Sequence, residues 1–244
     1  MKHLYRFLVE RDPVEEDGCW RILPDERHHL TRVLRMKSGD AAEYSDGKGT
    51  WGSGSIRTAG QNEAWIIESS RHYEPPPTQK LILCIGALRP GSIDELIPSL
   101  TELGVDEIHV FLSEGTPRFR LNEKTEQRWQ RVIVSSARQC RRAWLPTLVC
   151  HDSITALLKE LDQAATAGMY LHPGKVPEYT DTVRSLIQDK RQNLALVIGG
   201  EKGFSPQELQ QLSAGPLIQA NMGDQILRAF TAAIAATAIF TLNR

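Results

Sequence analysis

The chain beyond residue 77 alternates between short apolar runs and longer stretches with helical periodicity. The apolar runs predict strands at 81–85, 107–112, 147–150, 169–171, 194–198 and 217–220. The periodic stretches that follow them predict helices at 93–103, 123–143, 154–161, 182–190, 206–212 and 226–240. Because strands and helices alternate in this way, we predict an α/β domain with a parallel sheet covered by helices on both faces.

The residues at several predicted helix ends agree with this assignment. Ser205 is followed by Pro206 and Glu208, which is the pattern of a capping box with proline at the first helical position. Ser92 precedes two acidic residues, which favour a helix N-terminus there. Gly104 follows the apolar stretch as a helix stop signal. These signals place the predicted helices independently of hydrophobic periodicity.

A different pattern precedes the proline run at 75–77, so we expect one domain over 1–73 and a second over 74–244. The prolines restrict φ and predict a short, stiff linker. Before them, we predict strands at 5–9, 41–44, 52–56 and 64–68, a hairpin turn at 46–49 and one helix at 24–33. A segment of this length with such strands is typical of a small β-barrel.

Basic residues cluster in two places, although the formal net charge is only −1. Eight basic residues lie between Arg118 and Arg142, against Glu123 and Glu126 alone. Four more lie between Arg27 and Lys37, where no acidic residue occurs. On a nearly neutral chain, such clusters favour localised contacts with phosphates, with solvated helix faces as the alternative.

The helix predicted at 123–143 shows this pattern most clearly. Its inward stripe is expected to comprise Trp129, Val132, Ile133, Ser136, Ala137 and Cys140. Arginines occupy the other side, and a solvated face remains the alternative there. The predicted RNA-contacting residues in the two clusters are Arg32, Arg35, Lys37, Arg131, Arg138 and Arg142.

Other features restrict the environment of the protein. The four cysteines are scattered without a C-x-x-C pair, which favours buried free thiols in a reducing cytoplasm. The N-terminus has no apolar signal region, and the weakly polar stretch at 229–242 is shorter than a membrane span. His28 and His29 have no third ligand at a suitable spacing, so we expect neither a metal site nor a membrane.

Three glycine-containing turns follow predicted strands, at 171–175, 198–205 and 221–225. Parallel sheets bind ligands at the carboxyl ends of their strands, and glycine allows close backbone approach. No G-x-G-x-x-G pattern opens the first strand–helix unit, and the P-loop pattern does not occur. We therefore predict a shared pocket, although each turn alone could be a tight connection. His172 is either a catalytic candidate or an ordinary turn residue.

Several sequence motifs add a family resemblance. They are the two late turns, HHLxRVLRMKxGD at 28–40, TELGV at 101–105, QCxRxxxP at 139–146 and ILRxxTA at 226–232. Together they resemble the 16S rRNA (uracil-N3) methyltransferase family of the SPOUT superfamily, over nearly the whole chain. The resemblance implies a PUA-like barrel, a trefoil-knotted α/β domain, a homodimer and S-adenosyl-L-methionine as cofactor. The implied partner is 16S rRNA or the small ribosomal subunit, and the implied product is N3-methyluridine.

The resemblance and the turns together assign the site residues. The expected cofactor-binding residues are Leu171, His172, Ile198, Gly199, Gly200, Glu201, Gly203, Met222, Gly223, Ile226, Leu227 and Thr231. Arg228 is the fixed cation of the matched motif, and we expect it to hold the uracil oxygens as negative charge develops. The alternative for Arg228 is a structural role near the last helix.

The chain departs from the family pattern at several positions. Phe230 stands where the family carries a glutamate, and the G-P-E-G-G turn reads G-G-E-K-G, with Lys202. Pro98 and Ser99 replace Gln-Lys, and Arg138 replaces an acid. The proton acceptor is therefore open between Glu201, a phosphate and water. The alternatives are a SPOUT methyltransferase with a different RNA target and a non-catalytic RNA-binding relative.

Overall fold

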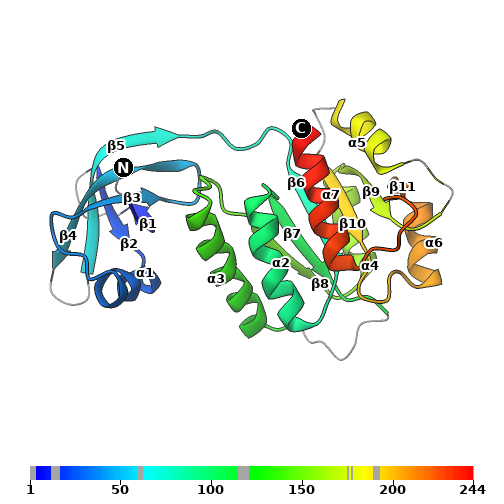
Figure 1. Cartoon of the computed structure of the whole chain (residues 1–244), viewed down its shortest axis with the longest axis horizontal. Coiled ribbons are helices and arrows are strands. Elements are labelled where there is room, and N and C mark those ends of the chain that lie inside the picture. Colours follow the sequence, from blue (N-terminus) through cyan, green and yellow to red (C-terminus); the bar gives the residue numbers. More distant parts are fainter. Residues whose placement is uncertain are drawn as a thin grey trace. The chain divides into compact units, whose positions relative to one another are not determined.

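The computed structural model, drawn in Figure 1, describes residues 4–11, 17–59, 63–114, 121–174, 176, 178–188 and 193–243. Arg118, Lys175 and Lys190, which fall within segments interpreted above, lie outside these residues. The chain divides into two compact units. One comprises residues 1–76 and 137–145, and the other comprises 77–136 and 146–244.

The first unit contains a closed five-stranded barrel, which confirms the predicted small β-barrel. Its strands, in spatial order, are β1 (Arg6–Arg11), β2 (Cys19–Ile22), β5 (Glu63–Tyr73), β4 (Thr50–Ala59) and β3 (Ala41–Ser45). β1 closes the barrel by pairing in parallel with β3. The interior is filled by apolar and aromatic side chains, among them Phe7, Trp20, Ile22, Tyr44, Ile56 and Ile66.

The local signals of the barrel also correspond to the structure. The predicted helix at 24–33 is a short α-helix, α1 (Pro24–His28), continued by a π-helical turn, η1 (His29–Val33). At the predicted hairpin turn, Asp46 Oδ1 accepts hydrogen bonds from the backbone N–H groups of Lys48 at 2.7 Å and Thr50 at 2.9 Å. Gly47 there has a φ of +67°, which explains the glycine.

The segment 137–145 packs with the barrel, which the sequence did not indicate. Arg6 Nη1 donates to the carbonyl of Arg141 at 2.7 Å, and the N–H of Leu145 donates to the carbonyl of Gly47 at 3.0 Å. The predicted helix at 123–143 is therefore too long, since α3 (Glu123–Gln139) ends before Arg141, whose φ is +60°. Cys140 follows the helix and is exposed, so its expected inward position is wrong.

The second unit contains a six-stranded sheet in which every pairing is parallel, which confirms the predicted α/β domain. In spatial order its strands are β11 (Ile218–Ala220), β9 (Ala167–Leu171), β10 (Leu194–Ile198), β6 (Leu81–Gly86), β7 (Glu107–Phe111) and β8 (Thr147–His151). From β6 the chain moves outward through β7 and β8, and the later strands β9, β10 and β11 lie on the other side of β6. Parallel sheets bind ligands at such a switch in strand order.

Helices cover both faces of this sheet, as Figure 1 shows. One hydrophobic core includes side chains of α2 (Pro90–Glu102), α3, α5 (Tyr179–Gln188) and α7 (Ala229–Asn243). The other core includes side chains of α4 (Ile154–Gln163) and α6 (Pro206–Ala214). No helix in the described part of the chain is long and apolar enough to cross a membrane.

Three predicted helix starts need correction, and one capping prediction is confirmed. α5 begins at Tyr179 rather than at 182. α2 begins at Pro90 rather than at 93, so Ser92 lies within its first turn and Arg89 is the residue before it. α7 begins at Ala229 rather than at 226, which leaves Ile226 to Arg228 outside the helix. Ser205 and Glu208 form the expected capping box at the start of α6.

Candidate active site

A cavity of about 900 Å³ lies at the carboxyl ends of β9 and β10. The three predicted turns meet there, together with the segment after β6 and the start of α7. Every residue predicted to bind the cofactor lines this cavity except Gly223, which is not among its described lining residues. Phe204 of the second predicted turn also lines it, as do four residues outside the predicted turns: Leu88, Arg89, Ser92 and Glu95. The volume is near the upper end of the roughly 300–1,000 Å³ typical of small-ligand pockets.

The turn after β10 requires glycine because its backbone is folded tightly. The N–H of Gly203 donates to the carbonyl of Gly200 at 3.0 Å, and the φ of Gly203 is +72°. A Cβ added to Gly199 would lie 2.7 Å from the carbonyl carbon of Gly203. On the other side, a Cβ added to Gly86 would lie 2.4 Å from the nitrogen of Gly200. The backbone of the turn therefore lies directly against the end of β6 at Gly86.

Glu201 fixes this turn to the segment before α2. Its Oε1 accepts a hydrogen bond from the backbone N–H of Arg89 at 3.2 Å, and its Oε2 lies 3.3 Å from Arg89 Nε. The carboxylate is thus held at the N-terminus of α2, where the helix dipole favours negative charge. This position makes Glu201 a structural anchor of the turn.

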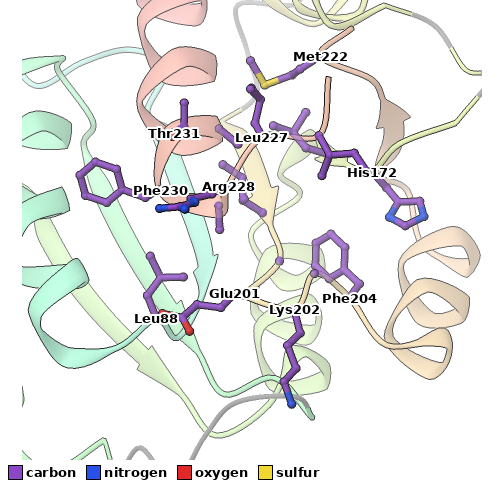
Figure 2. A pocket seen from close by; sticks show the side chains of 18 of the residues that line it. Leu88, His172, Glu201, Lys202, Phe204, Met222, Leu227, Arg228, Phe230 and Thr231 are labelled. Carbon is purple, nitrogen blue, oxygen red and sulfur yellow. The ribbon is translucent and has the colours of Figure 1, made fainter. Parts of the chain in front are cut away.

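Arg228 and Phe230 line the cavity at the start of α7. Figure 2 shows both side chains projecting to the same side of the start of α7, above Leu88. Arg228 is exposed, and its guanidinium has no hydrogen-bond or ion-pair partner within the described residues. No described contact therefore supports a structural role for Arg228. The imidazole of His172 points away from this group (Figure 2), so the two candidates occupy different ends of the cavity.

Glu208 supports the segment that carries Phe204 at the edge of the site. The sequence indicated Glu208 only as part of the capping box. Its side chain is buried, and its carboxylate accepts hydrogen bonds from Ser113 Oγ at 2.9 Å, Glu114 N at 3.2 Å and Ser205 N at 2.7 Å. These contacts connect α6 to the segment that follows β7. They hold the chain directly after Phe204, whose side chain lines the cavity.

The predicted RNA-contacting residues are distributed over both units. Arg32, Arg35 and Lys37 are exposed on and after η1 of the barrel unit. Arg131 is exposed on α3 in the sheet unit, and Arg142 is half-buried in the barrel unit. Arg138 differs, because its Nη1 lies 2.5 Å from the buried carboxylate of Glu26 within the barrel unit. It therefore forms an internal ion pair.

A chain of polar side chains, which the sequence did not reveal, crosses β7 and β8. Lys80 Nζ lies 2.8 Å from Glu107, His109 Nε2 lies 3.2 Å from Glu107, and His109 Nδ1 lies 3.0 Å from His151 Nε2. The hydrogen bond from His109, with that from Lys80, lowers the pKa of Glu107 to about 2. Burial lowers the pKa of His151. His109, His151 and Glu160 have ligand atoms within 4.8 Å of one another, and the two histidines already hydrogen-bond each other.

Comparison with known families decides the class of protein. Residues 74–241 match the model of the RNA methyltransferase domain. The chain belongs to this RNA methyltransferase family. Residues 22–69 match the RNA methyltransferase PUA domain, which lies within the barrel unit. The family resemblance read from the motifs is thereby confirmed.

Individual relatives cover nearly the whole chain. The protein is 29% identical over 238 residues to the Ribosomal RNA small subunit methyltransferase E of Mycobacterium bovis, covering 92% of this chain and 87% of the relative. It is 24% identical to the protein of that name from Bacillus subtilis, covering 94% and 93%. A structure of a putative methyltransferase from Legionella pneumophila with bound SAM has a TM-score of 0.83 at 22% sequence identity. The structure of the Neisseria gonorrhoeae Ribosomal RNA small subunit methyltransferase E bound to S-adenosyl methionine has a TM-score of 0.79 at 21% identity. Each covers 98% of both chains. These structures establish the shared fold.

Proposed function

We propose that the protein transfers a methyl group from S-adenosyl-L-methionine to N3 of a uridine in 16S rRNA. The observation that carries the proposal is that the turns after β9, β10 and β11 together form one cavity, with Arg228 at its edge. The names of the relatives support small-subunit rRNA as the substrate. The uridine N3 specificity follows from the motif resemblance.

The residues of the cavity fit the cofactor. Leu171, Ile198, Met222 and Leu227 offer apolar surface for its adenine and aliphatic parts, and the turn at 199–203 brings backbone N–H and C=O groups close. When bound, the cofactor supplies an electrophilic methyl group on a sulfonium. The protein then has to position the target base and stabilise the charge that develops on it.

Arg228 is placed to stabilise the charge that develops on the target base. N3 of uracil carries a proton at neutral pH, so it becomes nucleophilic only as that proton leaves. The negative charge then spreads onto the two uracil oxygens. The guanidinium of Arg228 is exposed at the cavity edge and has no partner among the described residues, so it offers N–H donors for those oxygens. We infer that Arg228 stabilises the developing anion.

The barrel domain, which we place at 1–73, would bind the rRNA that the catalytic domain at 74–244 methylates. Arg32, Arg35 and Lys37 are exposed and suited to phosphates, and we assign Arg131 and Arg142 the same role. Arg138 contributes to RNA binding indirectly, since its ion pair with Glu26 holds α1 against the segment that carries Arg142. Because rRNA is the substrate, we infer that the protein acts in the cytoplasm.

We further infer that a second copy of the chain covers α7. The helix has no charged residue between Ala229 and Asn243, so it lacks the polar face of an ordinary surface helix. Ile234 and Ile239 are only partly buried, and Leu242 is 87% exposed. An apolar helix left open in this way is typical of a homodimer interface. Sedimentation of the purified protein as a monomer would contradict this assignment.

The function is tested by deleting the gene and analysing the nucleosides of 16S rRNA by mass spectrometry. We expect one N3-methyluridine to disappear and to return on complementation. Loss of a different methylated nucleoside would identify a different RNA target. If no nucleoside changes and the purified protein does not bind S-adenosyl-L-methionine, the chain is a non-catalytic RNA-binding relative.

A further inference from the structure

The part of the cavity next to α2 has a composition that the cofactor does not explain. Arg89 precedes α2, and Ser92 and Glu95 lie on its first two turns, and all three line the cavity. α2 packs against α7, the helix whose start carries Phe230. The polar side chains of α2 and the apolar ring of Phe230 therefore belong to one end of the cavity.

This end contains one carboxylate that is free to act. The acidic side chains lining the cavity are those of Glu95 and Glu201, and Glu201 is already bound to Arg89. Glu95 is exposed and has no hydrogen-bond or ion-pair partner among the described residues. The adjacent Asp94 is directed elsewhere, since it pairs with Arg128 of α3. Consecutive helical residues point about 100° apart, so α2 uses Asp94 for packing and presents Glu95 to the cavity.

We propose that Glu95 is a catalytic residue that accepts the proton of the target ring N–H. The proposal rests on the function proposed above. It also accounts for Phe230, because a carboxylate supplied from α2 makes the family's glutamate at the start of α7 dispensable. In this chain the proton acceptor would therefore be supplied by α2 instead of α7.

The methyl transfer requires no reactant other than the target base and the methyl donor. The N3–H bond breaks and its proton moves to the Glu95 carboxylate, which becomes a carboxylic acid. The electron pair left on N3 forms the bond to the methyl carbon, while the carbon–sulfur bond breaks and its electrons return to the sulfonium sulfur, giving a thioether. The Glu95 carboxylic acid then releases its proton to water. Arg228 stabilises the uracil oxygens during the transfer.

The first test is Glu95→Gln, which keeps the size of the side chain and removes the proton acceptor. General-base catalysis typically contributes about 10²- to 10⁴-fold, so the single-turnover rate of methyl transfer should fall by about 100-fold or more. The affinities for S-adenosylhomocysteine and for 16S rRNA should stay unchanged.

Glu102→Gln is the matched control, because Glu102 is an exposed glutamate of the same helix that does not line the cavity. Its rate should equal that of the wild type. The double variant Glu95→Gln/Phe230→Glu moves the carboxylate from α2 to α7 and should regain most of the lost rate.

The outcomes separate this proposal from the function on which it rests. If Glu95→Gln methylates rRNA as fast as the wild type, or if Glu102→Gln is slowed equally, Glu95 is not the proton acceptor. A loss of cofactor or RNA affinity that accounts for the slower rate would also overturn the proposal. If the wild-type protein itself binds cofactor and transfers no methyl group to rRNA, the proposed function fails instead.

Discussion

Gly199 is the residue at which one added methyl group would disturb the cavity most directly. In Gly199→Ala, the new Cβ would lie 2.7 Å from the carbonyl carbon of Gly203, 2.9 Å from its Cα and 3.0 Å from the nitrogen of Phe204. Ordinary contacts of a Cβ begin near 3.4 Å. All three neighbours are backbone atoms, so no side-chain rotation relieves the clash. The turn has to open by several tenths of an ångström.

The expected loss follows from the cost of overpacking. Forcing an extra methyl group into a packed site typically costs about 1–3 kcal/mol. Opening the turn relieves that strain but displaces the backbone groups that we assign to the cofactor. Since each 1.4 kcal/mol changes an affinity tenfold, binding should weaken by roughly 10- to 100-fold.

Isothermal titration calorimetry with S-adenosylhomocysteine measures this loss, and thermal denaturation shows that the variant is folded. Gly215→Ala is the matched control, because a Cβ there meets only carbonyl oxygens at 3.6 and 3.7 Å, after α6 and outside the cavity. The control should bind like the wild type. Wild-type affinity in folded Gly199→Ala would refute the assignment of this turn to the cofactor.

Three further predictions follow from the site and its surroundings. Arg228→Ala should lower the single-turnover rate by about 100-fold or more while leaving cofactor affinity unchanged, and an undiminished rate would remove Arg228 from the mechanism. Charge reversal at Arg32 and Arg35 should weaken rRNA binding and reduce the log–log salt slope by roughly one for each lost phosphate contact, whereas an unchanged slope would leave them as solvated side chains. The pKa of Glu107 is lowered from 4.5 to about 2, so its stabilisation is present above pH 4.5 and is lost as the pH falls toward 2. Urea unfolding of Glu107→Gln should therefore show a smaller difference in stability between pH 7 and pH 3 than the wild type, and an equal difference would contradict this effect.

The sequence predicted the elements whose signals are local. The strands and helices of the sheet unit were found because apolar periodicity records which face is buried, and Ser205 and Glu208 cap α6 through neighbouring residues alone. β2 (Cys19–Ile22) was missed because three of its four residues are apolar and buried, so its sequence does not alternate. The start of α7 was placed too early because Ile226 to Arg228 continue its apolar pattern, although they line the cavity instead.

For the candidate site, too, the sequence predicted only the features that have local signals. The glycine turns were expected to meet because the carboxyl ends of parallel strands share one edge of the sheet. The pair of Arg89 and Glu201 joins residues 112 positions apart, and the pair of His109 and His151 depends on β7 and β8 being neighbours. Glu95 became a candidate only when the start of α2 was placed on the cavity. These contacts follow from strand order, which no local pattern records.

The most direct test of the central claim is methyl transfer in a purified system. The protein is incubated with methyl-labelled S-adenosyl-L-methionine and 16S rRNA from a strain that lacks the gene, and the digested nucleosides are separated by mass spectrometry. The account predicts that the label appears in N3-methyluridine, at one uridine for each rRNA molecule. Label in another nucleoside, or no label from a protein that binds the cofactor, would contradict it.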